Sequence, residues 1–384
     1  MNQGEIELIP FNIEQAFGDL QSRIMSDIVR RIRINGFVTR SADWQITRLK
    51  QLGESDASIK KWIRETLKLS DVAIDDIYAE TLKQEYLRNA ALYQSTGNVL
   101  IPFAKNKEMQ DLIGAIKKQT KEKFDNITRS MGFITKDGGQ IKALDLTRYY
   151  QKTLDSALGD IGTGAFDYNS ALKRTVKDMT NSGLRWIDYE SGYHSRVTVA
   201  SRRAAMTGFN QVVSHMNDGL AKDLKTNSFE VTWHAGARPE HMAWQGKVYT
   251  KEQLSSVCGL GSATGLKGIN CYHDYLPFVP GASTRNYTNK QLTEMNAAEL
   301  KSQNFNGKEY TKYEAIQRQR QLETNMRAYR QEVSLLKQGS ADSLDIRNAQ
   351  SKYHSASAEY IGLSKAMNLP QQRSRILLDG LGKV

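Results

Sequence analysis

Proline is scarce in this chain, and apolar residues recur at helical spacing along most of it. Only 6 of the 384 residues are proline, the residue that interrupts the hydrogen-bond ladder of a helix. Between Leu20 and Ile34, isoleucines and leucines recur mostly every four residues, with arginines between them. The sequence therefore predicts a mainly α fold with long helices. A charged fraction of 25% against 39% hydrophobic residues suits helices that are partly solvated.

Up to residue 226 we expect a succession of helices. Within this region, separate helices are expected before and after Gly53, because glycine is a weak helix former. A turn is expected at residues 136–139, and the glycines at 159, 162 and 164 predict a flexible joint. No strand is expected in this part of the chain.

The helical pattern is interrupted near residue 228. Phe229, Val231 and Trp233 alternate with polar residues, which is typical of a strand. Extended pieces are also expected at 246–250 and 270–278, with a turn of helix at 251–257 after the first of them. These segments predict a small α+β module near residues 228–283.

The remaining chain is predicted to be a helical tail with a basic charge. From Arg285 to the end there are 16 Lys+Arg and 10 Asp+Glu, so the tail carries +6 of the net charge of +11. Apolar residues follow a 4-3-4-3 spacing from Leu322 to Leu336, as in a helix that packs against a neighbour. The predicted division is a helical region at 1–226, the α+β module at 227–283 and the basic tail at 284–384.

Several classes of protein are excluded by composition. The two cysteines, Cys258 and Cys271, are too few for a disulfide scaffold and fit a reducing compartment. The first residues carry acids and no basic stretch before an apolar run, so no secretory signal is expected. No apolar stretch approaches the roughly 18 residues that span a bilayer, so no membrane is expected as a partner. A charge of +11 suits an anionic partner such as DNA.

The module concentrates the side chains that bind metals. These are His234, His241, Cys271 and His273. Imidazole nitrogen and thiolate sulfur are good Zn²⁺ ligands, so these four residues predict a structural zinc site. Their spacing, H-x6-H followed by C-x-H, departs from the paired spacing of common zinc fingers.

Two other interpretations of these residues remain open. They could be hydrogen-bonding residues that fix a tight group of loops. Alternatively, Cys271 could be a nucleophile with His234 or His241 as its base, and Asp274 or Glu240 could orient the imidazole. The last interpretation predicts a hydrolase, although no recognised nucleophile motif flanks the cysteine.

Arginines provide candidate contacts to DNA phosphates. Such contacts are electrostatic and independent of base sequence. The candidates are Arg202, Arg203, Arg318, Arg320, Arg327 and Arg330. The alternative is that they lie on solvated helix faces and form local salt bridges.

The module resembles a known family. The run VTWHAGARPEHMAWQGKVYT (Val231–Thr250) and the loop GLGSATGLKGINCYHDYLPFVPG (Gly259–Gly281) resemble the signature block of the phage minor capsid protein 2 family. The resemblance extends to RRAAMTGFNQ, which starts at Arg202, and to the segment Arg30–Gly53. The positions that match the block are His234, Gly236, Arg238, Pro239, His241, Trp244, Gly246, Asn270, Cys271, His273, Pro277 and Gly281.

The resemblance implies a structural role in the virion of a tailed bacteriophage. Members of this family are portal-associated proteins of head morphogenesis, present in few copies. The implied partners are the portal protein, the major capsid or scaffold proteins and non-specific double-stranded DNA, with influence on packaging or ejection. The implied location is the portal vertex of the head, and the host cytoplasm during assembly. No catalytic residues are implied by the resemblance. The alternatives are a metal-dependent or cysteine hydrolase that uses the His/Cys cluster, or a non-viral DNA-binding protein.

Overall fold

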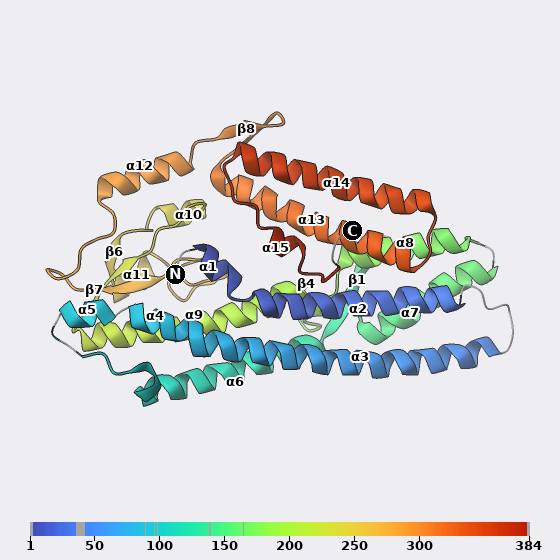
Figure 1. Ribbon diagram of the computed structural model, residues 1–384, viewed down its shortest axis with the longest axis horizontal. Coiled ribbons are helices and arrows are strands. Elements are labelled where there is room, and N and C mark those ends of the chain that lie inside the picture. The colour runs from blue at the N-terminus through green and yellow to red at the C-terminus, as the bar shows by residue number, and fades with distance from the viewer. Residues whose placement is uncertain are drawn as a thin grey trace.

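Long helices lie side by side along the length of the molecule (Figure 1). This computed structural model describes residues 3–35, 43–88, 90–95, 97, 99–137, 140–163 and 165–381. The helices up to residue 223 are α1 (Gln3–Leu8), α2 (Phe11–Asn35), α3 (Asp43–Asp76), a π-helical turn (Ile77–Thr81), α4 (Leu82–Arg88), α5 (Ala90–Ser95), a 3-10 turn (Phe103–Lys105), α6 (Lys107–Arg129), α7 (Leu146–Thr163), α8 (Tyr168–Ser182) and α9 (Val197–Asp223). Within the described ranges, no helix is both long and apolar enough to cross a bilayer.

Helix α2 lies at the centre of the core. Its residues Leu20, Ile24, Ile28 and Ile32 are all at most 1% exposed. The helix packs against α3 and α9, and also against α7, α8 and α13. These four predicted apolar positions are therefore confirmed as core, whereas Ile34 near the end of the helix is exposed.

Helix α3 corrects the expectation of two helices around Gly53. It runs without interruption from Asp43 to Asp76. One glycine costs a helix only about 1 kcal/mol relative to alanine. Packing of Trp62, Ile63 and Leu67 against the core offsets that cost. The predicted joint at the glycines is also wrong in part, since α7 continues through positions 159 and 162; position 164 lies outside the described residues.

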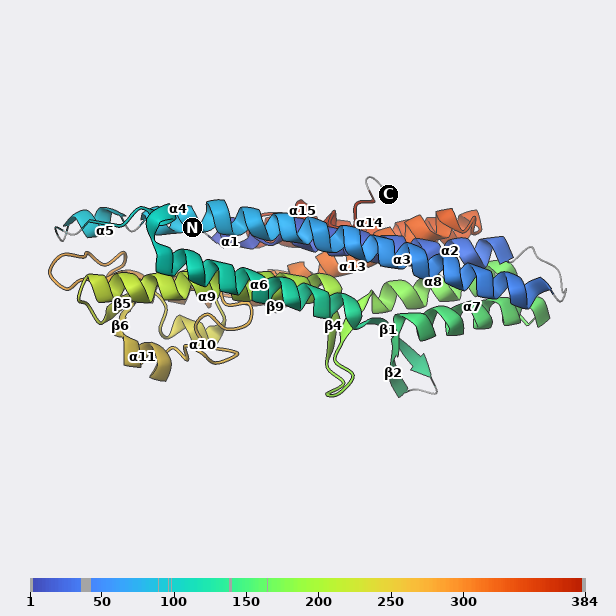
Figure 2. The ribbon, with the colours of Figure 1, turned by 90° about the horizontal axis from the view of Figure 1, so that it is seen from below.

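The N-terminal region also contains a sheet that the sequence analysis did not predict. Its strands are β1 (Met131–Asp137), β2 (Gln140–Asp145), β3 (Arg185–Ile187) and β4 (His194–Arg196), in the order β2-β1-β3-β4 with antiparallel pairing. The hairpin of β1 and β2 and the connection between β3 and β4 project from one side of the helical body (Figure 2). Of the turn predicted at 136–139, Lys136 and Asp137 lie on β1, whereas positions 138 and 139 lie outside the described residues.

The module at residues 228–278 has the predicted α+β structure. Its elements are β5 (Ser228–Val231), α10 (Pro239–Met242), β6 (Val248–Thr250), α11 (Lys251–Ser256) and β7 (Tyr275–Phe278). Strand β5 is central, and β6 and β7 pair with it antiparallel on either side. The three predicted extended pieces are thereby confirmed, and so is the predicted turn of helix, which is α11. This helix begins with a capping box formed by Thr250 and Gln253.

The tail forms a helical hairpin that packs on the N-terminal helices. Its elements are α12 (Asn289–Glu299), β8 (Gln303–Phe305), β9 (Lys308–Tyr310), α13 (Lys312–Gln338), α14 (Ser343–Ala366) and α15 (Arg373–Ile376). The predicted stripe is buried at Leu322, Met326, Val333 and Leu336, and α13 packs chiefly on α14, with further contacts to α8 and α2. The short hairpin of β8 and β9 was not predicted.

Buried polar contacts hold the tail together and attach it to the first helices. Arg330 of α13 forms a bidentate pair with Asp379, at 3.0 and 3.1 Å, and both side chains are at most 2% exposed. The chain at Leu378 approaches α2 so closely that a Cβ at Gly18 would lie 2.3 Å from its carbonyl oxygen. Glu7 at the other end of the chain accepts from Arg320 and from Gln372. Leu378 and Asp379, close to the end of the described chain, are therefore part of the core.

The Arg330–Asp379 pair makes a quantitative prediction. We expect Asp379→Asn to lower the free energy of unfolding by about 3–5 kcal/mol, because it leaves the buried guanidinium without its counter-charge. Urea denaturation measures the change.

The matched control is Glu294→Gln, which removes the exposed pair with Lys290 at 3.9 Å. Exposed pairs of this spacing contribute about 0.3–0.5 kcal/mol, so this variant should unfold almost as the parent does. Equal stability of the two variants would contradict the structural role of the buried pair.

Candidate metal centre

The loops at one end of the small sheet bring the predicted ligands together. His234 follows β5, and His241 lies on α10, whose first residue is Pro239. Cys271 and His273 lie in the segment that leads into β7. Gly236 adopts a φ of +68°, and a Cβ there would lie 2.2 Å from Ile316 of α13. A glycine is therefore required where this turn meets the tail.

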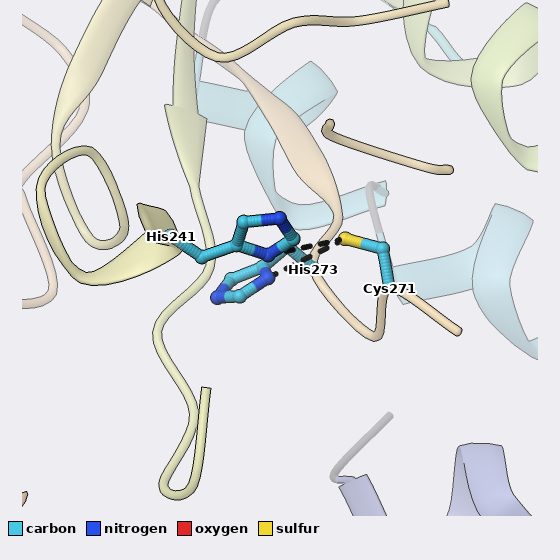
Figure 3. A group of neighbouring side chains, drawn as sticks. All are labelled: His241, Cys271 and His273. Atoms are coloured by element: carbon cyan, nitrogen blue, oxygen red, sulfur yellow. Dashed lines mark hydrogen bonds between the residues drawn. The ribbon is translucent and has the colours of Figure 1, made fainter. Parts of the chain in front are cut away.

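Three of the four predicted ligands converge. His241, Cys271 and His273, named the donor trio from here on, have their ligand atoms within 4.8 Å of one another (Figure 3). Cys271 Sγ lies 3.5 Å from His273 Nδ1 and 3.9 Å from His241 Nδ1. All three side chains are buried, with His241 and His273 at 1% exposure. The trio thus joins two chain segments that lie thirty residues apart.

A chain of hydrogen bonds fixes the tautomer of His273. The indole N–H of Trp233 can only donate, so its partner at 3.0 Å must be the side-chain oxygen of Asn296. The side-chain nitrogen of Asn296 donates to the carbonyl oxygen of Met242, which is consistent with this assignment. The side-chain oxygen of Asn296 also accepts from Gln245 Nε2 at 3.0 Å. The other amide atom of Gln245 is therefore its oxygen, which lies 2.9 Å from His273 Nε2. His273 must carry its proton on Nε2.

The tautomer of His241 is fixed by the main chain. His241 Nε2 lies 2.8 Å from the carbonyl oxygen of Thr264, an atom that can only accept. Arg238 donates to the same carbonyl and to that of Ile269, which holds the glycine-rich loop in place. Both histidines of the trio consequently hold a proton on Nε2 and a lone pair on Nδ1, and both lone pairs face Cys271.

Burial keeps the trio in its neutral form. It lowers the pKa of His241 below that of an ordinary imidazole and lowers the pKa of His273 well below it. Burial also raises the pKa of the Cys271 thiol. Near neutral pH the trio therefore presents two uncharged imidazoles and one thiol.

His234 lies beside the trio without joining it. Its ring centroid is 4.1 Å from that of His273, so the two rings are in contact. Its Nδ1 lies 3.0 Å from the carbonyl oxygen of Ala235 and therefore carries a proton. The prediction of four converging ligands is corrected to three, with His234 in a hydrogen-bonded structural position.

The geometry gives no support to a nucleophilic Cys271. The raised thiol pKa is opposite to the depressed value of an activated cysteine. Asp274 forms an ion pair with Lys267 at 2.8 Å, and Glu240 is exposed to solvent. The Nε2 atoms of the trio meet a carbonyl and an amide, so neither predicted carboxylate orients an imidazole.

A small cavity lies between the module and the tail. Its volume is about 90 Å³, and its lining includes His234, Cys271 and Tyr272 from the module and Ile316 and Arg320 from α13. Ligand pockets usually measure about 300–1,000 Å³. This cavity has room for water but is too small for a typical substrate. Cys271 and Tyr272 also line a second pocket of about 750 Å³, which is shared with residues of α9.

Each arginine predicted to bind DNA has a partner within the fold. Arg202 pairs with Glu14 at 3.2 Å, Arg320 pairs with Glu7 at 3.1 Å, and both contact the hydroxyl of Tyr272. The remaining partners are Glu359 for Arg318, the hydroxyl of Tyr193 for Arg203, the carbonyl of Arg375 for Arg327 and Asp379 for Arg330. Arg330, at 2% exposure, is inaccessible to a phosphate, which corrects that prediction.

The residues that support the trio were missed from the sequence. Gln245, Asn296 and Thr264 fix both tautomers, but they are ordinary polar residues with no metal-like spacing. Asn296 lies on α12, outside the predicted module. Only the family block contained a signal, because Trp244 and Gly246 flank Gln245 within the resembling run.

Comparison with known proteins adds information about the chain as a whole. The profile of a family described as phage minor capsid protein 2 matches residues 1–359. A protein named "Structural protein" from Lactococcus phage LL-H is 23% identical over 258 residues, which cover 63% of this chain and 67% of that protein. No solved structure matches the chain.

The hydrogen-bond chain predicts the protonation of both imidazoles. Long-range proton–nitrogen NMR correlations on histidine-labelled protein should show the Nε2–H tautomer for His241 and His273. Gln245→Met removes the acceptor of His273 while the carbonyl of Thr264 still holds His241. We therefore expect altered ring signals for His273, the same tautomer for His241, and a loss of about 1–3 kcal/mol in the free energy of unfolding.

An Nδ1–H tautomer for either ring in the parent protein would contradict this arrangement. The exposed His215 provides an internal reference in the same spectra, because no such network surrounds it.

Proposed function

Since the chain belongs to the phage minor capsid protein 2 family, we propose that it is a structural virion protein that acts at the portal vertex. It contacts the portal protein there during head morphogenesis, and its basic tail lies against packaged double-stranded DNA. The single observation that carries this proposal is the family match over residues 1–359. The LL-H relative, named a structural protein, supports the same class.

The shape of the molecule is consistent with attachment to a larger assembly. The 34 residues of α3 form a helix about 50 Å long, and α2, α6 and α9 lie along it (Figure 2). The module lies at one end of this body, and the hairpin of β1 and β2 projects farther along it. A rigid body with separate projecting parts can contact two neighbours at once. We infer that these neighbours are the portal protein and the major capsid or scaffold protein.

Contact with DNA is proposed for exposed cations of the tail. The six arginines considered first are used within the fold, as described above. By contrast, Lys301, Lys337, Arg347 and Lys365 are exposed. Their charges face solvent, where a phosphate backbone can approach without a change in the fold.

A structural role is favoured over a hydrolytic one. Neither Asp274 nor Glu240 orients a histidine, because Asp274 pairs with Lys267 and both Nε2 atoms of the trio meet a carbonyl or an amide oxygen. We therefore propose that this chain has no catalytic activity of its own.

Analysis of purified phage particles tests the location. Quantitative mass spectrometry should find the chain in mature particles, in far fewer copies than the major capsid protein. Chemical cross-linking of the same particles should connect its lysines to the portal protein. Absence from the particles, or cross-links to capsid or scaffold proteins with none to the portal, would overturn the portal-vertex proposal.

The DNA contact makes a separate prediction about salt. The purified chain should bind duplex DNA without sequence preference, with an affinity that falls steeply as salt rises. The triple variant Lys337→Gln, Arg347→Gln and Lys365→Gln should bind more weakly. The slope of log affinity against log salt should decrease by up to about 3, which is about 1 for each lost phosphate contact.

A matched control removes the same charge from another part of the surface. Lys61 and Lys68 of α3 and Lys83 of α4 are exposed, and their triple glutamine variant also lowers the net charge by three. We expect this control to keep most of the affinity and slope of the parent. Equal losses in both triple variants would show that net charge, rather than the tail, determines binding.

A further inference from the structure

We propose that the donor trio binds one zinc ion through Nδ1 of His241, Nδ1 of His273 and Sγ of Cys271. The ion would connect α10 to the segment before β7 and so close the small module. This site does not depend on the portal or DNA contacts proposed above.

The first argument is a shortage of hydrogen atoms inside the trio. Both Nδ1 atoms carry a lone pair, because both Nε2 protons are used by Gln245 and Thr264. The thiol of Cys271 has a single hydrogen, so it can satisfy only one of the two lone pairs that face it. A buried acceptor without a donor is costly. A cation between the three atoms satisfies both lone pairs at once.

The second argument is the spacing of the donors. Zinc binds sulfur at about 2.3 Å and imidazole nitrogen at about 2.0–2.1 Å, and tetrahedral angles then place the sulfur about 3.5 Å from each nitrogen. The observed separations are 3.5 and 3.9 Å. The Cys271–His273 separation matches that value, and the Cys271–His241 separation exceeds it by about 0.4 Å.

The third argument is the chemistry of the donors. Two imidazoles and a thiol without a carboxylate do not suit Mg²⁺ or Ca²⁺, which prefer oxygen ligands. Imidazole and thiolate together suit zinc. On binding, the zinc ion would replace the thiol proton, which is released to solvent, and Cys271 would become a thiolate.

The fourth argument is the support around the trio. Metal-binding histidines usually donate their second ring N–H to a fixed acceptor, which orients the ring toward the ion. Both histidines of the trio do so, and Gln245, at 0% exposure, is itself held by Asn296. The rings are therefore oriented for a ligand before any ion binds.

The cavity beside the trio indicates the role of the ion. With about 90 Å³ it has space for water as a fourth ligand, whereas a substrate needs several times that volume. The ion would thus stabilise the module and its contact with α13.

The chain supplies a matched pair of variants for the test. Cys271→Ser removes the sulfur of the trio, whereas Cys258→Ser removes the other buried cysteine of the same module, which lies outside the trio. The untagged full chain is purified after expression with added zinc, and metal content is measured by elemental analysis. We expect about one zinc per chain in the parent and in Cys258→Ser, and a large loss in Cys271→Ser. A chelator should lower the melting temperature of the first two proteins and leave that of the third unchanged.

A spectroscopic measurement on the parent chain remains decisive if Cys271→Ser does not fold. Cobalt added to zinc-depleted protein should produce a thiolate-to-metal charge-transfer band, and Cys258→Ser should retain it. The proposal is overturned if the parent binds neither zinc nor cobalt. It is also overturned if folded Cys271→Ser keeps its zinc, since the ion would then lie elsewhere, for example at the exposed His215 or His354.

Discussion

Charges buried between helices determine how this molecule is held together. A buried guanidinium is tolerated only when a carboxylate or several acceptors face it. Here Glu14 pairs with Arg202 of α9, Glu7 pairs with Arg320 of α13, and Asp379 pairs with Arg330 within the tail. The module joins this group through the hydroxyl of Tyr272, which both Arg202 and Arg320 contact. The tail consequently cannot be an independent basic arm, and its net charge overstates the charge available to a partner.

The partners of these arginines are the feature that the sequence pattern predicted least well. A run such as Arg318, Arg320, Arg327 and Arg330 has the same appearance whether it faces solvent or a buried acid. The acids concerned lie far away in the chain, with Glu7 and Arg320 separated by 313 positions. Periodicity is local information, so it predicted the helices and the apolar stripe of α13 but not the partners of the polar residues. The hairpin of β1 and β2 was missed for a different reason, because few of its side chains are buried to impose an alternating pattern.

At the candidate site, too, contacts between residues distant in the sequence could not be predicted from local pattern. The positions of His241, Cys271 and His273 in the sequence were sufficient to expect convergence, since two segments of one small sheet carry them. The sequence position of His234 did not predict its place correctly, because its Nδ1 bonds to the carbonyl of Ala235 and not to the trio. Gln245 and Asn296 have no spacing that marks them, and their importance follows only from hydrogen bonds that cross between the module and α12. Candidate ligand residues can thus be recognised in a sequence, whereas the residues that orient them can be identified only from contacts in the folded structure.

The close contact of Leu378 with Gly18 has a consequence for biosynthesis. A ribosome releases the N-terminal helices many residues before it has made the segment that covers them. Until residue 379 has emerged, Arg330 has no counter-charge and one surface of α2 is uncovered. The nascent chain therefore passes through a stage in which its long helices have formed but the segment around Leu378 does not yet cover α2. A host chaperone, or early encounter with another virion component, would be most useful at that stage.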